Sequence, residues 1–103
     1  MRLLIAVYMM TNKPRGTLYV GVTSDLFRRY IEHRDGLIPG FTTRYGLKQL
    51  VGWERHGSMV EAIAREKAIK HYIRAWKVNA IEELNPAWQD LGPALLSGYE
   101  HRL

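Results

Sequence analysis

The sequence predicts a single domain of the α/β (α+β) class. Two apolar runs rich in β-forming residues lie on either side of a short turn, which predicts a β-hairpin. A third run of this kind follows later, and helical patterns stand after the hairpin and after the third run. A chain of 103 residues suits one modest core. We place the domain at residues 1–91 and expect residues 92–103 to be a poorly ordered tail.

The predicted hairpin opens the chain. Leu3–Met10 forms its first strand, and the turn-forming residues of Thr11–Gly16 end that strand. Leu18–Val22 then forms the second strand. Because the connection is short, we expect the two strands to pair antiparallel.

A helix is predicted directly after the hairpin. Either Ser24 or Thr23 can cap its N-terminus, and Asp25 lies in the first turn, where a negative charge is favourable. Gly36 closes the helix. A glycine-containing loop then leads to the third predicted strand, at Leu50–Arg55.

The second half of the chain is predicted to be mainly helical. Ser58 and Glu61 form a capping box that opens the longest helix, which we expect to end at about Trp76. A shorter helix covers about Val78–Leu84 and ends before Pro86.

Charge and composition restrict the classes of function. The formal net charge of +5 makes a polyanion such as nucleic acid a plausible partner. The chain has no cysteine, which excludes disulfides, thiolate zinc sites and cysteine nucleophiles. The opening run MRLLIAVYMM is too short to span a membrane, and no small-residue cleavage site follows it. We therefore expect a cytoplasmic protein that does not associate with membranes.

The helix after the hairpin carries two candidate functional residues. Arg29 and His33 are four residues apart, so they project from the same side, at the edge of the apolar face. The ordinary interpretation is a surface arginine and histidine on an amphipathic helix. The functional interpretation is a pair that faces a ligand together.

Glu66 interrupts the apolar stripe of the long helix. That stripe consists of Met59, Ala62, Ile63, Ile69 and Ile73. A buried lone carboxylate is costly unless it is paired, protonated or bound to a metal. Glu66 can form an ion pair with Lys70 one turn later, or it can lie hydrated in a cleft. It can also hold a divalent cation, because hard cations prefer oxygen ligands.

Several of these features together resemble the GIY-YIG nuclease superfamily. Val7-Tyr8 and Tyr19-Val20-Gly21 are similar to the two halves of its signature at a fitting spacing, and a helix with arginine and then histidine follows. The resemblance covers roughly residues 3–91 and is to small stand-alone bacterial members, similar to UvrC and intron endonucleases. It implies a central three-stranded antiparallel sheet flanked by helices, metal-dependent hydrolysis of nucleic-acid phosphodiesters, and a link to DNA repair.

The resemblance also implies the site residues. The catalytic positions would be Tyr8, Tyr19, Arg29, His33, Glu66 and Asn85. Glu66 would be the ligand of Mg²⁺ or Mn²⁺, and Asn79 competes with Asn85 for the asparagine position. A tyrosine can act as general base only if its pKa falls from about 10, and the sequence leaves open which tyrosine does so.

The sequence departs from the family pattern in two places. Ala6-Val7-Tyr8 replaces GIY, and Val22 stands where some relatives carry a lysine. We expect no second domain for target recognition, and therefore low sequence specificity, a preference for a special structure, or action as a homodimer or with a partner protein.

Basic residues are the candidates for contacts with nucleic acid, with DNA as the expected partner. They are Arg44, Lys48, Lys67, Lys70, Arg74 and Lys77. They serve equally well in the main alternative, a catalytically weak nucleic-acid-binding module that shares the fold.

Overall fold

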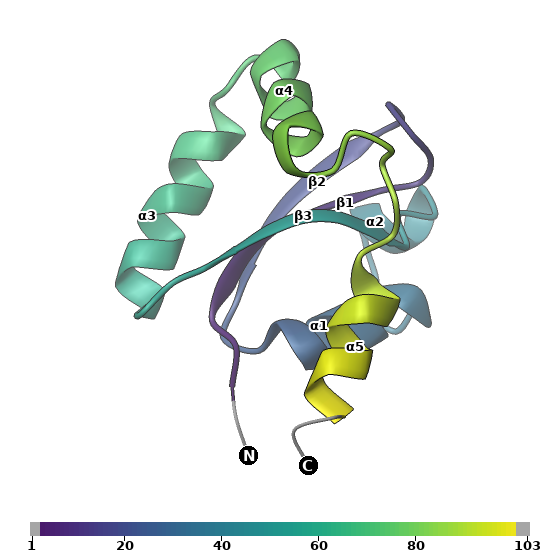
Figure 1. Cartoon of the computed structure of the whole chain (residues 1–103), viewed down its shortest axis with the longest axis vertical. Helices are drawn as coiled ribbons and strands as arrows, with labels where there is room; N and C mark the ends of the chain where they lie inside the picture. The colour runs from purple at the N-terminus through teal and green to yellow at the C-terminus, as the bar shows by residue number, and fades with distance from the viewer. Residues whose placement is uncertain (1–2, 101–103) are drawn as a thin grey trace.

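A three-stranded antiparallel sheet forms the centre of the protein (Figure 1). The structure is a computed structural model, and it describes residues 3–100. The strands β1 (Ala6–Thr11), β2 (Leu18–Thr23) and β3 (Gln49–Arg55) lie in the order β2-β1-β3. The α+β class, the hairpin and the third strand are confirmed.

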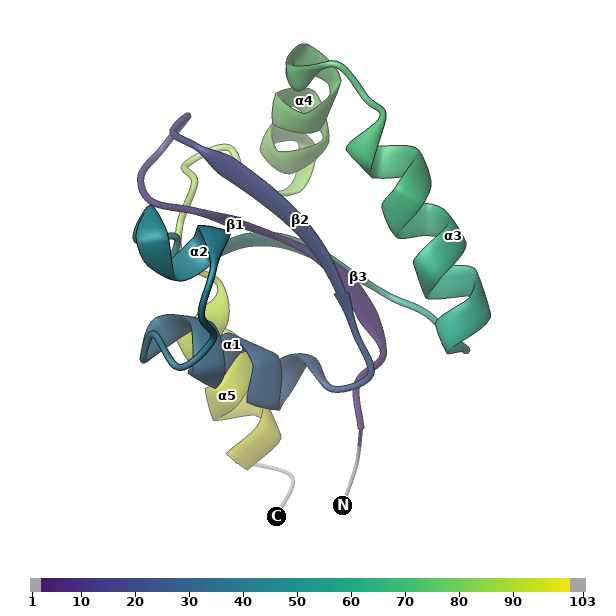
Figure 2. The ribbon, with the colours of Figure 1, turned by 180° about the vertical axis from the view of Figure 1, so that it is seen from behind.

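Helices cover both faces of the sheet. On one face lie α1 (Leu26–Arg34), α2 (Phe41–Arg44) and α5 (Gly92–Glu100), and on the other lie α3 (Met59–Lys70) and α4 (Arg74–Leu84). Figure 2 shows the same two layers from behind, with the curved sheet between them. We call them the α1 layer and the α3 layer.

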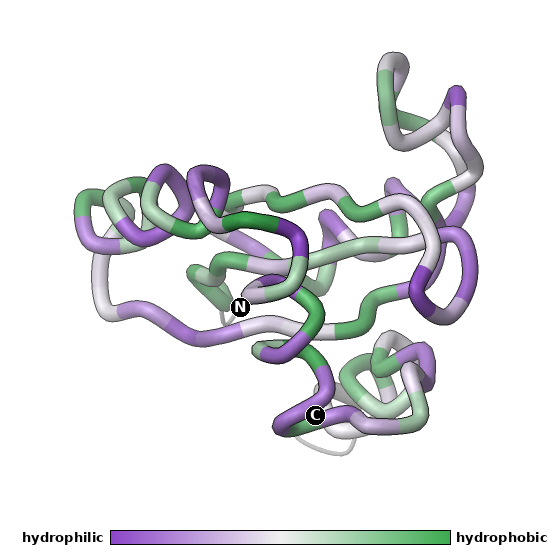
Figure 3. Tube along the Cα trace, turned by 90° about the horizontal axis from the view of Figure 1, so that it is seen from above, coloured by the Kyte–Doolittle hydropathy of each residue, from purple (hydrophilic) through white to green (hydrophobic). Residues whose placement is uncertain are grey.

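The alternation of side chains along β1 divides the core between the two layers. All six residues of β1 are buried, as expected for a central strand covered on both faces. Tyr8 and Met10 face the α1 layer together with Leu26, whereas Val7 and Met9 face the α3 layer. In Figure 3 hydrophobic and hydrophilic residues alternate along the helical coils, because only one side of each helix packs on the sheet.

The first helix begins and ends close to the predicted positions. Its N-cap position is Asp25, rather than Ser24 or Thr23, and no side chain caps the helix. Thr23 instead accepts a hydrogen bond from the Asp25 backbone N–H at 3.1 Å, which shapes the turn before the helix. Gly36 follows the helix with a φ of 68°, a conformation that favours glycine, as predicted.

The long helix is shorter than predicted. The capping box is present, since Ser58 Oγ accepts a hydrogen bond from the Glu61 N–H at 3.2 Å. However, α3 ends at Lys70 rather than near Trp76, and α4 begins at Arg74. The break lets the chain reverse, so that α4 can also pack on the sheet, through the buried Ile81. Ile73 consequently leaves the predicted apolar stripe and is 61% exposed.

The segment after residue 91 differs from the poorly ordered tail that we expected. Residues 92–100 form α5, and residues 101–103 lie outside the described part of the chain. Tyr30 donates a hydrogen bond to Asp90 at 2.9 Å, and the Leu91 N–H donates to the Leu50 carbonyl at 2.7 Å. These bonds dock α5 on the domain core.

The helices between residues 3 and 100 do not include one that is both long and apolar enough to cross a membrane.

Gly92 provides a test of the docking of α5. A Cβ at this position would lie 1.8 Å from Cζ of Tyr30, so Gly92→Ala must displace the buried Tyr30 ring. Overpacking of this kind costs about 1–3 kcal/mol. We expect the midpoint of thermal unfolding to fall, and circular dichroism measures it.

Gly98→Ala is the matched control in the same helix. A Cβ there meets no atom within 4 Å, so we expect unchanged or slightly higher stability. Equal melting temperatures for the two variants would contradict the docking of α5.

Candidate active site

Tyr8 and Tyr19 stand side by side on the sheet face that the α1 layer covers. Tyr8 pairs with Gly21 and Met10 pairs with Tyr19 across the hairpin, so both tyrosines project from the same face. Their ring centroids are 6.2 Å apart. Tyr8 is buried and Tyr19 is partly buried, so Tyr19 is the tyrosine with access to solvent.

Gly21 leaves room for the Tyr8 ring. A Cβ at this position would lie 2.5 Å from Cζ of Tyr8 and 2.8 Å from Cε2 of Tyr19. Gly21, in the second half of the signature, is therefore needed because the ring of Tyr8, in the first half, lies directly over it.

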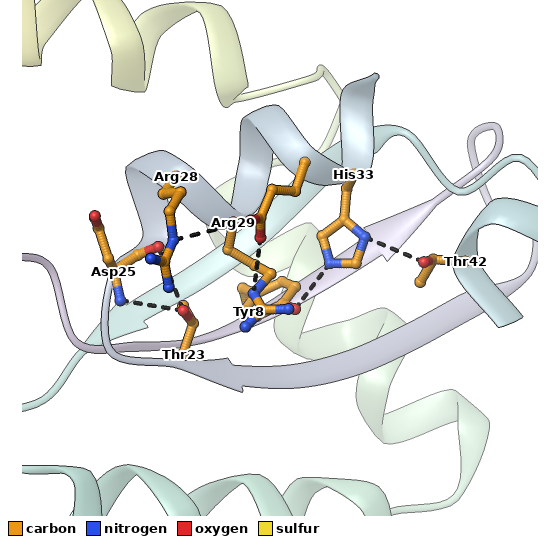
Figure 4. Close-up of polar contacts among 8 residues, drawn as sticks. Tyr8, Thr23, Asp25, Arg28, Arg29, His33 and Thr42 are labelled. Atoms are coloured by element: carbon orange, nitrogen blue, oxygen red, sulfur yellow. Dashed lines mark hydrogen bonds and ion pairs between the residues drawn. The ribbon is translucent and has the colours of Figure 1, made fainter. Parts of the chain in front are cut away.

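His33 links the tyrosines to α2. Its Nε2 lies 2.9 Å from the Tyr8 hydroxyl, and its Nδ1 lies 3.2 Å from Thr42 Oγ1 (Figure 4). The imidazole also packs against the Tyr19 ring, with centroids 5.9 Å apart. His33 is only 5% exposed, because α2 packs over it. Our expectation that it projects at the boundary with solvent is therefore wrong.

Burial holds both members of the Tyr8–His33 pair neutral at pH 7. It raises the pKa of Tyr8 above its usual range, with a further contribution from Tyr19. Burial and, to a smaller extent, the positive charge of Arg29 together lower the pKa of His33 to about 4. The neutral imidazole then donates from one ring nitrogen and accepts at the other, so Tyr8, His33 and Thr42 form one hydrogen-bonded chain in either tautomer.

Arg29 lies beside this chain, whereas Arg28 points to solvent. The Arg29 side chain is 32% exposed, and its charge acts on the pKa values of both Tyr8 and His33. Its Nε is buried without a hydrogen bond and lies 3.7 Å from Glu32 Oε1. The Arg28 side chain is 64% exposed. A half-buried guanidinium beside a tyrosine pair suits the binding of an anionic oxygen.

Glu66 lies in the α3 layer. Its Oε2 is 3.0 Å from Lys70 Nζ, so the i,i+4 pair that we considered is present. The Glu66 side chain is 13% exposed and that of Lys70 is 50% exposed. The structure therefore brings Tyr8, Tyr19, Arg29 and His33 together, but pairs Glu66 with Lys70 on a helix that packs against β1 and β2 from the other face.

A divalent cation is chemically compatible with Glu66. Within residues 3–100, no three acidic, histidine or cysteine side chains gather in a group that would hold a metal. Mg²⁺ needs only one or two carboxylates, because it keeps several of its waters. Lys70 is half exposed, and an i,i+4 pair contributes only about 0.3–0.5 kcal/mol, so Lys70 can turn away.

Asn85 has a structural function at the end of α4. Its Nδ2 donates to the carbonyls of Val51 and Gln89, at 3.1 and 2.9 Å. Its Oδ1 accepts from the Gln89 N–H at 3.0 Å. The amide thus ties the loop after α4 to β3. Asn79 is exposed on α4, and a catalytic role for either asparagine stays a prediction.

The candidate nucleic-acid contacts are divided between the two layers. Arg44 lies on α2 in the α1 layer and Lys48 lies between α2 and β3, and both are exposed, whereas Lys67 and Lys70 are exposed on α3. Lys77 is partly buried on α4. Arg74 donates to the carbonyls of Arg15 and Gly16 at 2.6 and 2.7 Å, so it holds the hairpin turn.

Thr42 is the one member of the hydrogen-bonded chain that the sequence did not single out. It lies in α2, which has only four residues and falls in the segment that we expected to be a loop. Such a short helix leaves no detectable periodicity. The only local signal is a pair of threonines between two glycines.

The depressed pKa of His33 predicts a dependence of stability on pH. In the unfolded chain His33 has a pKa near 6.5 and is protonated below that pH. In the folded protein His33 is protonated only near pH 4 and below. The free energy of unfolding should therefore fall as the pH decreases from 6.5 to 4. We expect the part lost at pH 4.5 to be on the order of 2 kcal/mol.

Denaturant unfolding of the wild type and His33→Gln at pH 7 and pH 4.5 measures this effect. Glutamine cannot titrate, so the variant should lose less stability on acidification than the wild type. Equal losses in the two proteins would show that His33 is not a buried neutral histidine.

Comparisons with known proteins identify the family of this chain. The model of the GIY-YIG catalytic domain matches residues 4–79. A UPF0213 protein of Staphylococcus epidermidis is 35% identical over 68 residues, which cover 66% of this chain and 83% of the relative. A UPF0213 protein of Staphylococcus saprophyticus matches with the same identity and coverage. No solved structure gives a significant match.

The family match spans both strands of the hairpin and the helices that carry Arg29, His33 and Glu66. Both tyrosines, the glycine that makes room for them and the arginine beside them lie within it. The chain belongs to the GIY-YIG family.

Proposed function

We propose that this protein is a divalent-metal-dependent endonuclease that hydrolyses phosphodiester bonds in DNA. The observation that carries the proposal is the buried chain of Tyr8, His33 and Thr42 with Tyr19 and Arg29 beside it. We call these five residues the tyrosine cluster. A GIY-YIG catalytic domain suggests nuclease-type activity, and the polar groups of this cluster support the proposal.

Each residue of the cluster would have a separate role in hydrolysis. A water attacks phosphorus and gives up a proton to a general base, the bond to the leaving oxygen breaks, and the leaving oxygen takes up a proton. Tyr19 is only partly buried and would lie next to this water as the base. Tyr8 is unsuited as the base, because burial raises its pKa. The Tyr8 ring instead packs against the Tyr19 ring and positions it. Arg29 binds the nonbridging phosphate oxygens.

Glu66 would hold the divalent cation, Mg²⁺ or Mn²⁺. GIY-YIG nucleases generally use divalent metals. When bound, the cation would neutralise charge on the phosphate. Asn85 would contribute by fixing the loop that packs on β3, and its catalytic role stays a prediction.

We further propose a cytoplasmic enzyme with low sequence specificity or with structure specificity, acting alone, as a homodimer or with a partner protein. The positive charge of the chain supports attraction to DNA before any specific contact forms. Arg44 and Lys48 would approach the backbone near the tyrosines.

The second candidate function is a nucleic-acid-binding module without substantial catalysis. The observation that favours it is the placement of Glu66, which is paired with Lys70 in the α3 layer. Such a module would use the same basic residues and leave the tyrosine cluster as part of the core.

Glu66→Ala separates the two functions. Lys70 is half exposed, so removing its partner leaves no buried lone charge, and the midpoint of thermal unfolding should change little. For a nuclease, Glu66→Ala should abolish Mg²⁺- or Mn²⁺-dependent cleavage of labelled DNA and retain DNA binding. Cleavage gels and fluorescence anisotropy measure the two properties.

Lys70→Ala is the matched control from the same ion pair. It should retain cleavage, because it frees the Glu66 carboxylate. Full cleavage by Glu66→Ala would refute the metal site, and a wild type that binds DNA but never cleaves it would establish the binding module.

A further inference from the structure

The tyrosine cluster continues to the surface through α2. The Phe41 ring is stacked on Tyr19 at an interplanar angle of 28°, with centroids 6.3 Å apart. Tyr45 follows, with its centroid 4.8 Å from that of Phe41. Phe41 is 46% exposed and Tyr45 is 51% exposed. A run of aromatic rings therefore leads from the buried Tyr8 to solvent.

The rest of the structure holds these two rings outward. Thr42, between them, is buried and contacts His33, so α2 cannot rotate to bury Phe41 without breaking that contact. Gly40 and Gly46 flank the helix with φ angles of 118° and 66°, which fix the chain direction at both ends. Two large exposed rings in a fixed position form a contact surface rather than a mobile loop.

The segment that carries these two rings is positively charged. The segment from Gly36 to Trp53 contains Arg44 and Lys48 and no acidic residue. Both basic side chains are exposed. Asp35, just before this segment, pairs with Arg34 and also feels the charge of Lys48. Two exposed rings in a segment whose own charges are all positive suit a ligand with a flat apolar face and a negatively charged backbone.

We propose that Phe41 and Tyr45 form a stacking platform for an unpaired base of the DNA strand whose phosphate lies at Tyr19. This inference rests on the proposed function and specifies its substrate class. Aromatic side chains stack on bases of any identity, because every base has a π-face. In a duplex both faces of each internal base are already stacked, so the platform favours single-stranded DNA, overhangs and flaps.

The test compares two labelled DNA strands of equal length. One carries normal bases, and the other carries abasic sites at every internal position and so retains only its sugar–phosphate backbone. The affinity for each strand is measured by fluorescence anisotropy without divalent metal, so that the DNA is not cleaved during the measurement. Stacking of one base is expected to make the wild type bind the normal strand about tenfold more tightly than the abasic strand.

Variants of the platform locate the effect. Phe41→Ala and Tyr45→Ala should each remove most of the preference for the normal strand, whereas Tyr45→Phe should retain it. Trp76→Ala is the control, since this tryptophan is 57% exposed on α4 in the other layer and should not affect the preference. Tyr45 contacts Phe41 rather than Tyr19, so Tyr45→Ala tests the platform even if Phe41→Ala disturbs the cluster.

Two results would overturn the inference. Equal binding of the two strands by the wild type refutes the platform, even if the protein still cleaves DNA and the nuclease proposal stands. An unchanged preference in Tyr45→Ala likewise refutes it. Failure to bind or cleave any DNA would refute the proposed function together with the platform.

Discussion

The contact of His33 with Tyr8 on one side and Thr42 on the other organises this protein. It joins the central strand β1, the helix α1 and the short helix α2 through a single buried imidazole. Because Thr42 is held inward, Phe41 faces outward and stacks on Tyr19. The register of the hairpin sets Tyr19 beside Tyr8, and the hydrogen-bonded chain then holds α1 and α2 against this pair.

Burial determines the chemistry that this cluster can perform. Tyr8 keeps its proton and His33 stays neutral at pH 7, so the chain holds its geometry without a buried charge. The cation of the cluster is Arg29, at its edge, and the Glu32 carboxylate lies 3.7 Å from its Nε. A neutral, fixed interior with one cation at its rim fits recognition of an anion better than it fits a purely structural core.

Local patterns in the sequence predicted the elements that depend on short-range signals. The half-motifs placed Tyr8 and Tyr19 on adjacent strands, and the capping box located the start of α3. Features that depend on tertiary packing were missed: the burial of His33 under α2, the break after Lys70 and the docking of α5. Each is decided by a partner that lies far away in the sequence. The place of Glu66 in the site is of the same kind and remains a prediction.

The central claim is that the tyrosine cluster performs chemistry rather than only packing. The most direct measurement is the rate of Mg²⁺-dependent DNA cleavage by Tyr19→Phe, which removes one hydroxyl and keeps the ring. The account predicts a loss of about 100-fold or more with unchanged DNA binding and thermal stability. Cleavage by Tyr19→Phe at the wild-type rate would contradict it.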